Sequence, residues 1–243
     1  MREYADFVLR EKPAVTCKHC QDRSDFMKTF NMRELLALAL CGLLLAGPLA
    51  DWQPVVAAAP QLELVQTVSH ISAGDAHTCA ITTAGHVQCW GNNEYGQLGN
   101  DTRKSSATPV EVQGLGDGVR AVATGYFHTC AITAEGGVKC WGSNSTGQLG
   151  NGGGIDRLTP VDVLGLSSGV NAIVMGGSIY DGQGHTCALL ATGAVMCWGY
   201  NDFGQLGDGT TTDRNQPVVV SGLSSGIQAI TASREHTCAL TTA

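Results

Sequence analysis

The sequence predicts an all-β fold: a β-propeller of four-stranded blades of roughly 50 residues each, with about three and a half blades present. The first observation is a repeat, because the stretch from His77 to Gly99 returns at 128–150 and 185–207 and begins again at His236. The first cysteine of the repeat recurs in steps of 51, 57 and 51 residues. The second observation is composition, since 32 glycines with only 14% charged residues suit turn-rich β structure. The third is the alternation of apolar residues within each copy, which indicates short strands.

Length and charge narrow the classes of function. A chain of 243 residues can bury a sizeable core as one β domain. Residues 1–59 carry seven Lys/Arg and seven Asp/Glu, whereas residues 60–243 carry seven and fourteen, so the repeats hold the whole net charge of −7. An acidic repeat region binds phosphate backbones poorly, and we therefore expect no nucleic acid as a direct partner.

The N-terminal region has the layout of a secretory signal peptide. The apolar run from Leu35 to Leu45 follows Lys28 and Arg33 and precedes small residues at 55–59. Extended to position 50 the run has 16 residues, which is short for a membrane-spanning helix of about 20. Because a signal peptide starts only a few residues before its apolar run, we place the true start at Met27. The competing interpretation is a genuine cytoplasmic tail followed by an uncleaved anchor, which would be the only membrane contact.

These features divide the chain into three parts. Residues 1–26 are an upstream tail outside the true start, and 27–59 are a helical signal peptide or membrane anchor. Residues 60–243 are the propeller repeats, with units near 68–121, 122–172 and 173–229 and a partial unit at 230–243. The predicted location is secreted or at the cell surface.

Two cysteines in the upstream tail invite a metal interpretation. Cys17 and Cys20 are three residues apart, but a zinc site needs four ligands and no second Cys/His pair lies nearby. A haem attachment motif needs His after the second cysteine, and Gln21 stands there. We therefore predict no metal site.

Each repeat begins with a hairpin that brings two cysteines together. Thr83-Ala84-Gly85 reads as a three-residue hairpin loop, with glycine last where a left-handed conformation is needed. Pairing the strands about Ala84 places Cys79 opposite Cys89 at a non-hydrogen-bonded position, where side chains are closest. The other copies, centred on positions 135 and 192, agree. The sequence thus predicts three disulfides, with buried free thiols as the alternative: Cys79–Cys89, Cys130–Cys140 and Cys187–Cys197.

The rest of each unit supplies a locking loop and two further strands. After the hairpin comes Trp-Gly-x-Asn-x-x-Gly-Gln-Leu-Gly, in which we expect Trp and Leu to anchor the loop in the core and Asn to bond its backbone. We expect one strand at 109–112, 160–163 and 217–220, and another at 119–123, 170–174 and 227–230. The small residues Ala80, Ala131, Ala188 and Ala239 suit close approach by a neighbouring sheet.

The motif His-Thr-Cys-Ala-Ile/Leu followed by Cys-Trp-Gly-x-Asn-x-x-Gly-Gln-Leu-Gly resembles the repeat of the regulator of chromosome condensation family, in its secreted, cysteine-paired bacterial form. The resemblance covers residues 68–243 and implies a β-propeller, usually of seven blades. Because the chain ends within the fourth hairpin, the partner expected for Cys238 is missing. We expect the chain to be a fragment of a longer protein, with self-association of an open arc as the alternative.

Function is expected where the copies differ. The four repeat histidines recur in every unit, which favours a structural role over metal binding, and no catalytic constellation stands out. The extended loop 176–184 aligns with 75–76, 126–127 and 234–235. Exposed aromatic residues often anchor interfaces, so these loops supply the candidate binding residues: Tyr126, Phe127, Ile179, Tyr180, Asp181 and Arg234.

These observations favour a secreted or cell-surface binding scaffold, not an enzyme, with a protein or cell-surface ligand as partner and no cofactor. The resemblance implies one alternative, a guanine-nucleotide exchange or regulatory factor. A second alternative is part of a larger secreted enzyme, adhesin or inhibitor.

Overall fold

The computed structural model describes residues 67–177 and 182–242. Their regular secondary structure consists of β-strands, as the alternating pattern predicts. The predicted signal or anchor segment, Cys17 and Cys20 lie outside the described residues. The strands of the first two units are β1 (Val68–Ala73), β2 (His77–Thr82), β3 (Val87–Gly91), β4 (Ser106–Glu111), β5 (Ala121–Thr124), β6 (His128–Ile132), β7 (Val138–Gly142) and β8 (Arg157–Asp162). The strands that follow are β9 (Val170–Gly177), β10 (Gly184–Leu190), β11 (Val195–Gly199), β12 (Arg214–Val219), β13 (Ile227–Ala232) and β14 (Thr237–Thr241).

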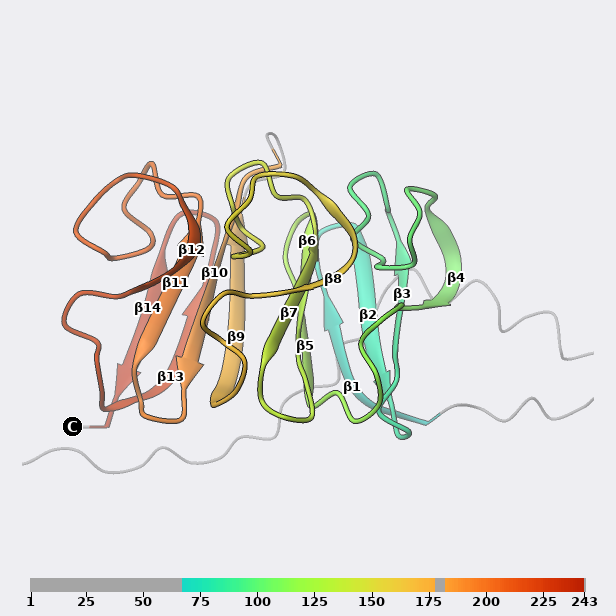
Figure 1. Cartoon of the computed structure of the whole chain (residues 1–243), viewed down its shortest axis with the longest axis horizontal. Coiled ribbons are helices and arrows are strands. Elements are labelled where there is room, and N and C mark those ends of the chain that lie inside the picture. Colours follow the sequence, from blue (N-terminus) through green and yellow to red (C-terminus); the bar gives the residue numbers. More distant parts are fainter. Residues whose placement is uncertain (1–66, 178–181, 243) are drawn as a thin grey trace, which may run out of the picture. The chain divides into compact units, whose positions relative to one another are not determined.

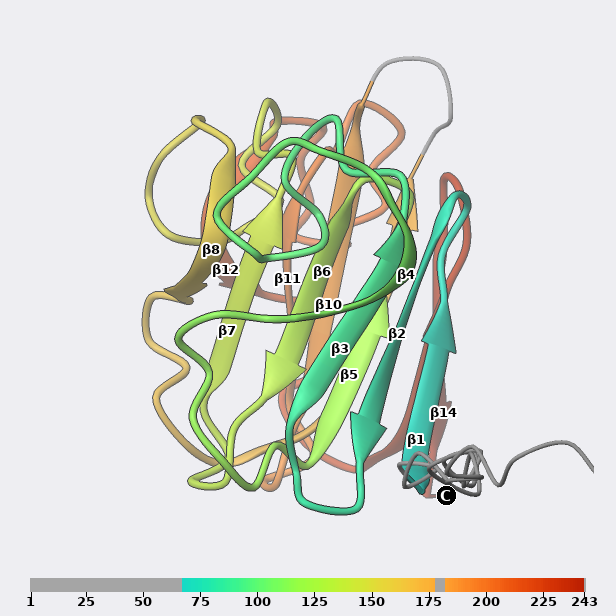
Figure 2. The same cartoon turned by 90° about the vertical axis from the view of Figure 1, so that its right-hand side faces the viewer.

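Each unit forms its own antiparallel sheet. The strands follow chain order in three four-stranded sheets, β1–β4, β5–β8 and β9–β12, and β13 pairs with β14 in a fourth (Figure 1). Figure 2 looks along the row of sheets, with β3 in front of β6 and β7. The first strands of successive sheets contact each other, since β1 contacts β5, β5 contacts β9 and β9 contacts β13. This is the stacking of propeller blades.

The hairpins have the register that the sequence predicts. Cys79 lies opposite Cys89, and the equivalent pairs lie opposite each other in the next two sheets. The paired Cα atoms are 4.1 Å apart, which is typical of non-hydrogen-bonded positions. The sulfur atoms lie at disulfide distance, at 2.12, 2.01 and 2.08 Å. Gly85 ends the first hairpin loop with φ at 84°, a left-handed conformation that glycine adopts without a steric penalty.

The core lies between adjacent sheets. Leu98 and Val112 of the first unit pack in one cluster with Trp141 of the second. Leu149 and Val163 of the second unit pack in the same way with Trp198 of the third. The predicted anchoring by Trp and Leu is therefore an anchoring between units, because each tryptophan is buried against the unit before it.

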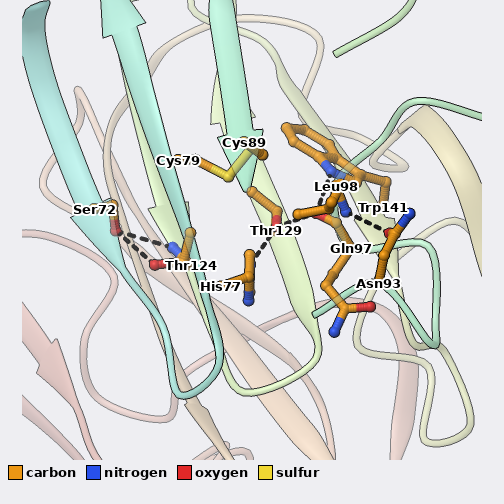
Figure 3. The surroundings of a disulfide bond; sticks show 10 residues. All are labelled: Ser72, His77, Cys79, Cys89, Asn93, Gln97, Leu98, Thr124, Thr129 and Trp141. Carbon is orange, nitrogen blue, oxygen red and sulfur yellow. Dashed lines mark hydrogen bonds between the residues drawn. A yellow bond between two sulfur atoms is a disulfide. The ribbon is translucent and has the colours of Figure 1, made fainter. Parts of the chain in front are cut away.

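Buried hydrogen bonds join the same pairs of units. The indole nitrogen of Trp141 and the hydroxyl of Thr129 both donate to the main-chain oxygen of Gln97, each over 2.9 Å (Figure 3). The Thr129 hydroxyl has one proton and donates it to Gln97, so its oxygen accepts the N–H of His77 Nε2, which lies 2.8 Å away. His128 and Thr186 repeat this contact at 3.0 Å in the next pair of units.

Candidate functional site

The loops that differ most between units gather at one end of the strands. We call this end the loop face. It is made by the described residues of the loops between first and second strands, 74–76, 125–127, 182–183 and 233–236, and by the long loops that follow third strands, 92–105, 143–156 and 200–213. Figure 1 shows the long loops together at one end, with the short hairpin turns at the other.

An asparagine holds each long loop in shape. The amide nitrogen of Asn93 donates to the main-chain oxygens of Thr102 and Lys104 over 3.0 and 3.1 Å, and its side-chain oxygen accepts the N–H of Leu98 over 2.9 Å. Asn144 and Asn201 make the corresponding bonds in their own units. Because these asparagines are fully buried, they support the loops from beneath and leave the variable residues to form the surface.

Aromatic side chains from two units meet on the loop face. Tyr95 of the first long loop contacts Phe127 of the second unit, with ring centroids 4.9 Å apart and ring planes at 48°. Tyr126 precedes Phe127 and lines a hollow of about 330 Å³ together with Asp75, Thr124 and Met175. All three aromatic rings are half-buried, and Asp75 is exposed. We use the name aromatic cluster for Tyr95, Tyr126 and Phe127, of which Tyr95 and Phe127 contact each other and Tyr126, the residue before Phe127, lines the hollow. Aromatic side chains next to a polar hollow are a combination that ligand-binding surfaces use.

A glycine in the wall of this hollow packs closely against a buried histidine. Gly125 lies against the ring of His128, and a Cβ at that position would come within 2.7 Å of the ring carbon Cε1. The side-chain hydroxyls of Ser72 and Thr124 bond each other over 2.8 Å beside it, as Figure 3 shows. Residues of the first two units are thus hydrogen-bonded to each other at the wall of the hollow. This bonding favours a binding surface that is formed before the ligand arrives.

The structure brings together only part of the predicted set. Tyr126 and Phe127 lie in the loop between β5 and β6, whereas Ile179, Tyr180 and Asp181 lie outside the described residues. Arg234 lies in the equivalent loop of the last unit and forms an ion pair with Glu235 over 3.4 Å.

Sequence reasoning missed two aromatic residues of the loop face. Tyr95 belongs to the aromatic cluster, and Phe203 occupies the same repeat position with 63% of its surface exposed. A usable signal was present, because this position of the Trp-Gly-x-Asn-x-x-Gly motif varies between Tyr95, Thr146 and Phe203, whereas the Asn two positions before it and the Gly directly after it are the same in all three copies.

The three buried repeat histidines, His77, His128 and His185, have structural contacts and are uncharged near neutral pH. Burial lowers the pKa of His77 and of His185 to about 4. Burial, with a smaller contribution from the neighbouring histidines, lowers the pKa of His128 to about 3. Each of these rings donates Nε2–H to a threonine of the next unit, so its proton lies on Nε2 and Nδ1 is bare. The Nδ1 atoms of His77 and His185 are buried without a hydrogen-bond partner.

The described residues offer little for metal or membrane chemistry. Within 67–177 and 182–242, no group of three or more His, Cys, Asp or Glu side chains could hold a metal ion. In the same part of the chain, no helix is long and apolar enough to cross a membrane.

Comparison with known proteins identifies the repeat. The model of the regulator of chromosome condensation (RCC1) repeat matches residues 84–132, 135–189 and 192–240, and a second RCC1 repeat model matches 68–97 and 119–148. The ultraviolet-B receptor UVR8 of Arabidopsis thaliana is 36% identical over 176 residues, which is 72% of this chain and 39% of the receptor. The probable E3 ubiquitin-protein ligase HERC4 of Homo sapiens is 35% identical over 175 residues, 71% of this chain and 16% of the ligase.

Solved structures show the same fold. Human WBSCR16 superposes with a TM-score of 0.62 and 26% identity, covering 72% of this chain and 45% of that one. Yeast RCC1 (Prp20), in its complex with Kap60, also gives 0.62, with 19% identity and coverage of 73% and 42%. This chain thus spans less than half the length of each of these relatives. With family models matching along most of residues 68–240 and the four-stranded sheets stacked as blades, the chain belongs to the regulator of chromosome condensation (RCC1) repeat family.

Proposed function

We propose that this chain is a secreted or cell-surface scaffold that holds a protein ligand on its loop face. The observation that carries the proposal is the aromatic cluster beside its hollow, built from loops in which the units differ. The shared His, Trp, Asn and Gln residues form the hydrogen bonds that join and shape the units. We therefore assign binding to the residues that differ between units, which are held in place by the shared residues, as is usual in repeat proteins.

The cysteine pairs support export. Three pairs at disulfide distance in one domain suit an oxidising compartment, because cytosolic thiols are kept reduced. Alkylation of the unfolded chain before and after reduction, followed by intact-mass measurement, tests the pairs. We expect six additional alkyl groups after reduction; an unchanged mass would refute the disulfides. Fractionation of the source cells tests the location, and a cytosolic protein with free thiols would contradict export.

A matched pair of variants tests the loop face. Tyr95→Ser combined with Tyr126→Ser removes two rings of the aromatic cluster, whereas Val68→Ser removes a side chain that is 52% exposed at the start of β1, opposite Thr82 and away from the loop face. Full-length wild-type and variant chains are used to capture surface proteins from the source cells, with quantification by mass spectrometry. We expect the double variant to capture at least tenfold less ligand than the wild-type chain, and Val68→Ser to capture as much. Equal capture by the double variant would overturn the proposal for this face.

Family membership supports a second candidate, a guanine-nucleotide exchange or regulatory factor. A direct test is release of labelled GDP from a Ran-type GTPase in the presence of the chain. Because the repeats are acidic and carry paired cysteines, we expect no acceleration. A tenfold faster release would favour this candidate over the scaffold. Membership of a larger secreted enzyme, adhesin or inhibitor remains compatible with the scaffold role.

A further inference from the structure

An arginine joins the long loops of the first two units. The guanidinium of Arg103 donates one N–H to the main-chain oxygen of Glu94 over 2.6 Å and another to the carboxylate of Asp156, in the second unit, over 3.1 Å. The other carboxylate oxygen of Asp156 accepts the main-chain N–H of Asn144 over 3.0 Å. The carboxylate is thus oriented by its own loop and paired with a cation from the preceding unit.

The junction between the second and third units keeps this carboxylate but lacks the arginine. Asp213 occupies the repeat position of Asp156, and its Oδ1 accepts the main-chain N–H of Asn201 over 2.7 Å. Gly154 occupies the repeat position of Arg103. Among the residues that the structure describes, Asp213 takes part in no ion pair. The second junction therefore presents an oriented carboxylate without its cation.

A hollow lies where the arginine side chain is absent. It measures about 430 Å³ and is lined by Gly154 and Asp213 together with other residues of both units. A Cβ at Gly154 would meet, among the described residues, only the main-chain oxygen of Asn144, at 3.7 Å. Four of the lining positions hold a smaller side chain than the corresponding positions of the first junction: Ser145 for Glu94, Thr146 for Tyr95, Gly154 for Arg103 and Asn215 for Leu158.

Hydrogen bonds between the two units fix the rim of this hollow. The main-chain N–H of Gly152 donates to the main-chain oxygen of Asn215 over 2.8 Å, and the side-chain nitrogen of Asn215 donates back to the oxygen of Gly152 over 2.9 Å. Both units have all four of their strands, β5–β8 and β9–β12, so the hollow belongs to a complete junction. Because the rim is already ordered, a ligand that enters it has little ordering to pay for.

The charges around the hollow favour a cation. Arg214 also lines it, but the guanidinium of Arg214 is paired with the carboxylate of Asp208 over 2.8 Å. Burial raises the pKa of Asp213; the hydrogen bond from Asn201 opposes this effect, and the negative charge of Asp202 adds to it. A positive charge placed beside Asp213 would offset both the burial and the repulsion from Asp202.

We propose that this hollow is a subsite for an arginine side chain of the protein ligand, with the guanidinium bonded to the carboxylate of Asp213 and to the main-chain oxygen of Ser145. The inference rests on the function proposed above, because it names one group by which the loop face recognises that ligand. Arginine suits the subsite better than lysine, since its planar guanidinium can donate to a carboxylate and a carbonyl together. Arg103 makes this pair of contacts within the chain at the first junction.

The probe is N-acetyl-arginine amide, titrated into the isotope-labelled full-length chain and followed by NMR. We expect amide shifts at 145–147, 153–156 and 213–216, and weaker binding of N-acetyl-lysine amide. Asp213→Asn removes the charge while its side-chain oxygen still accepts the N–H of Asn201, and should weaken binding about tenfold. Asp117→Asn is the matched control, because it removes a carboxylate that is 85% exposed elsewhere. Absent binding, equal binding to Asp213→Asn, or equal binding of the lysine amide would overturn the proposal.

A second variant fills the subsite from within the chain. Gly154→Arg places a guanidinium at the repeat position of Arg103, where it should pair with Asp213 and reduce both binding of the arginine amide and capture of the surface ligand about tenfold. Ile155→Arg adds the same charge at a side chain that is 73% exposed and does not line the hollow, and should change neither.

The two proposals fail separately in these experiments. If the ligand is captured through the aromatic cluster and Gly154→Arg captures as much as the wild-type chain, the arginine subsite is wrong and the scaffold function stands. If the arginine amide binds at Asp213 but the Tyr95→Ser and Tyr126→Ser double variant captures as much ligand as the wild-type chain, the proposal for the aromatic cluster fails and the subsite stands.

Discussion

Acidification from pH 7 to pH 5 is expected to destabilise the repeat domain through its buried histidines. In the folded chain the pKa of His77 and of His185 is lowered to about 4 and that of His128 to about 3, against 6.5 for an unperturbed histidine. The unfolded chain therefore binds more protons than the folded chain below pH 6.5. Stability is complete above that pH and is lost progressively as the pH falls toward the folded-state values.

The size of the effect follows from the separation of the pKa values. At pH 5 an unfolded-state histidine is almost fully protonated while the three buried rings are neutral, which costs about 2 kcal/mol for each ring and about 6 kcal/mol together. Net stabilities of domains are about 5–15 kcal/mol, so a loss of this size brings the domain close to unfolding. The physical cause is that a charged imidazolium cannot be solvated between the sheets.

Urea unfolding of the full-length chain, followed by tryptophan fluorescence at pH 7, 6 and 5 and constant ionic strength, measures this dependence. His128→Gln removes one titrating ring while its amide can still donate to Thr186. We expect this variant to lose about a third of the pH dependence, with a cost at pH 7 of about 1–2 kcal/mol. His70→Gln is the control, since His70 is exposed and does not contribute to the lowered pKa of any of the three buried rings. If His128→Gln keeps the full pH dependence, the buried histidines are not its source.

Three further substitutions test the supports of the repeat by denaturant unfolding. Replacing Cys130 and Cys140 together by alanine opens a loop of eleven residues and should cost at most about 3 kcal/mol; an unchanged midpoint would show that the pair is not bonded in the protein. Trp141→Phe deletes the indole donor to the Gln97 oxygen and should cost about 1–3 kcal/mol, and a cost near zero would mean that this bond does not join the units. Asn144→Ala deletes the bonds that hold its loop and should cost about 2 kcal/mol, with faster hydrogen exchange confined to 143–156; protection that stays unchanged there would contradict the support role.

Much of the scaffold was predictable because the register of a hairpin depends only on residues that are close together in the sequence. Side chains alternate between the two faces of a strand, and the three-residue loop fixes where the two strands of the hairpin start to pair. Together these two constraints allow one register for β2 and β3, in which Cys79 lies opposite Cys89. The strand ends were less predictable: the structure starts β4 at Ser106, ahead of the expected 109, because pairing with β3 extends past the apolar residues.

The candidate site was only half predictable. The mismatch between repeat copies pointed to Tyr126 and Phe127, but Tyr95 comes from a different unit and meets Phe127 across 32 positions of sequence. The same holds for the histidines, because their recurrence favoured a structural role but did not identify the residues that they bond. His77 and Thr129 stand 52 residues apart, and no local pattern joins them.

By itself, the sequence determined the repeat, the strand-rich units, the facing of paired cysteines and the family resemblance, since each depends on spacing along one chain. Only the tertiary structure decided which residues of neighbouring units touch: the tryptophan against the glutamine oxygen of the preceding unit, the histidine against the threonine of the next unit, and Tyr95 against Phe127. The physical reason is that register within a hairpin is set by backbone geometry, whereas contacts between sheets are set by how whole sheets stack and exclude water.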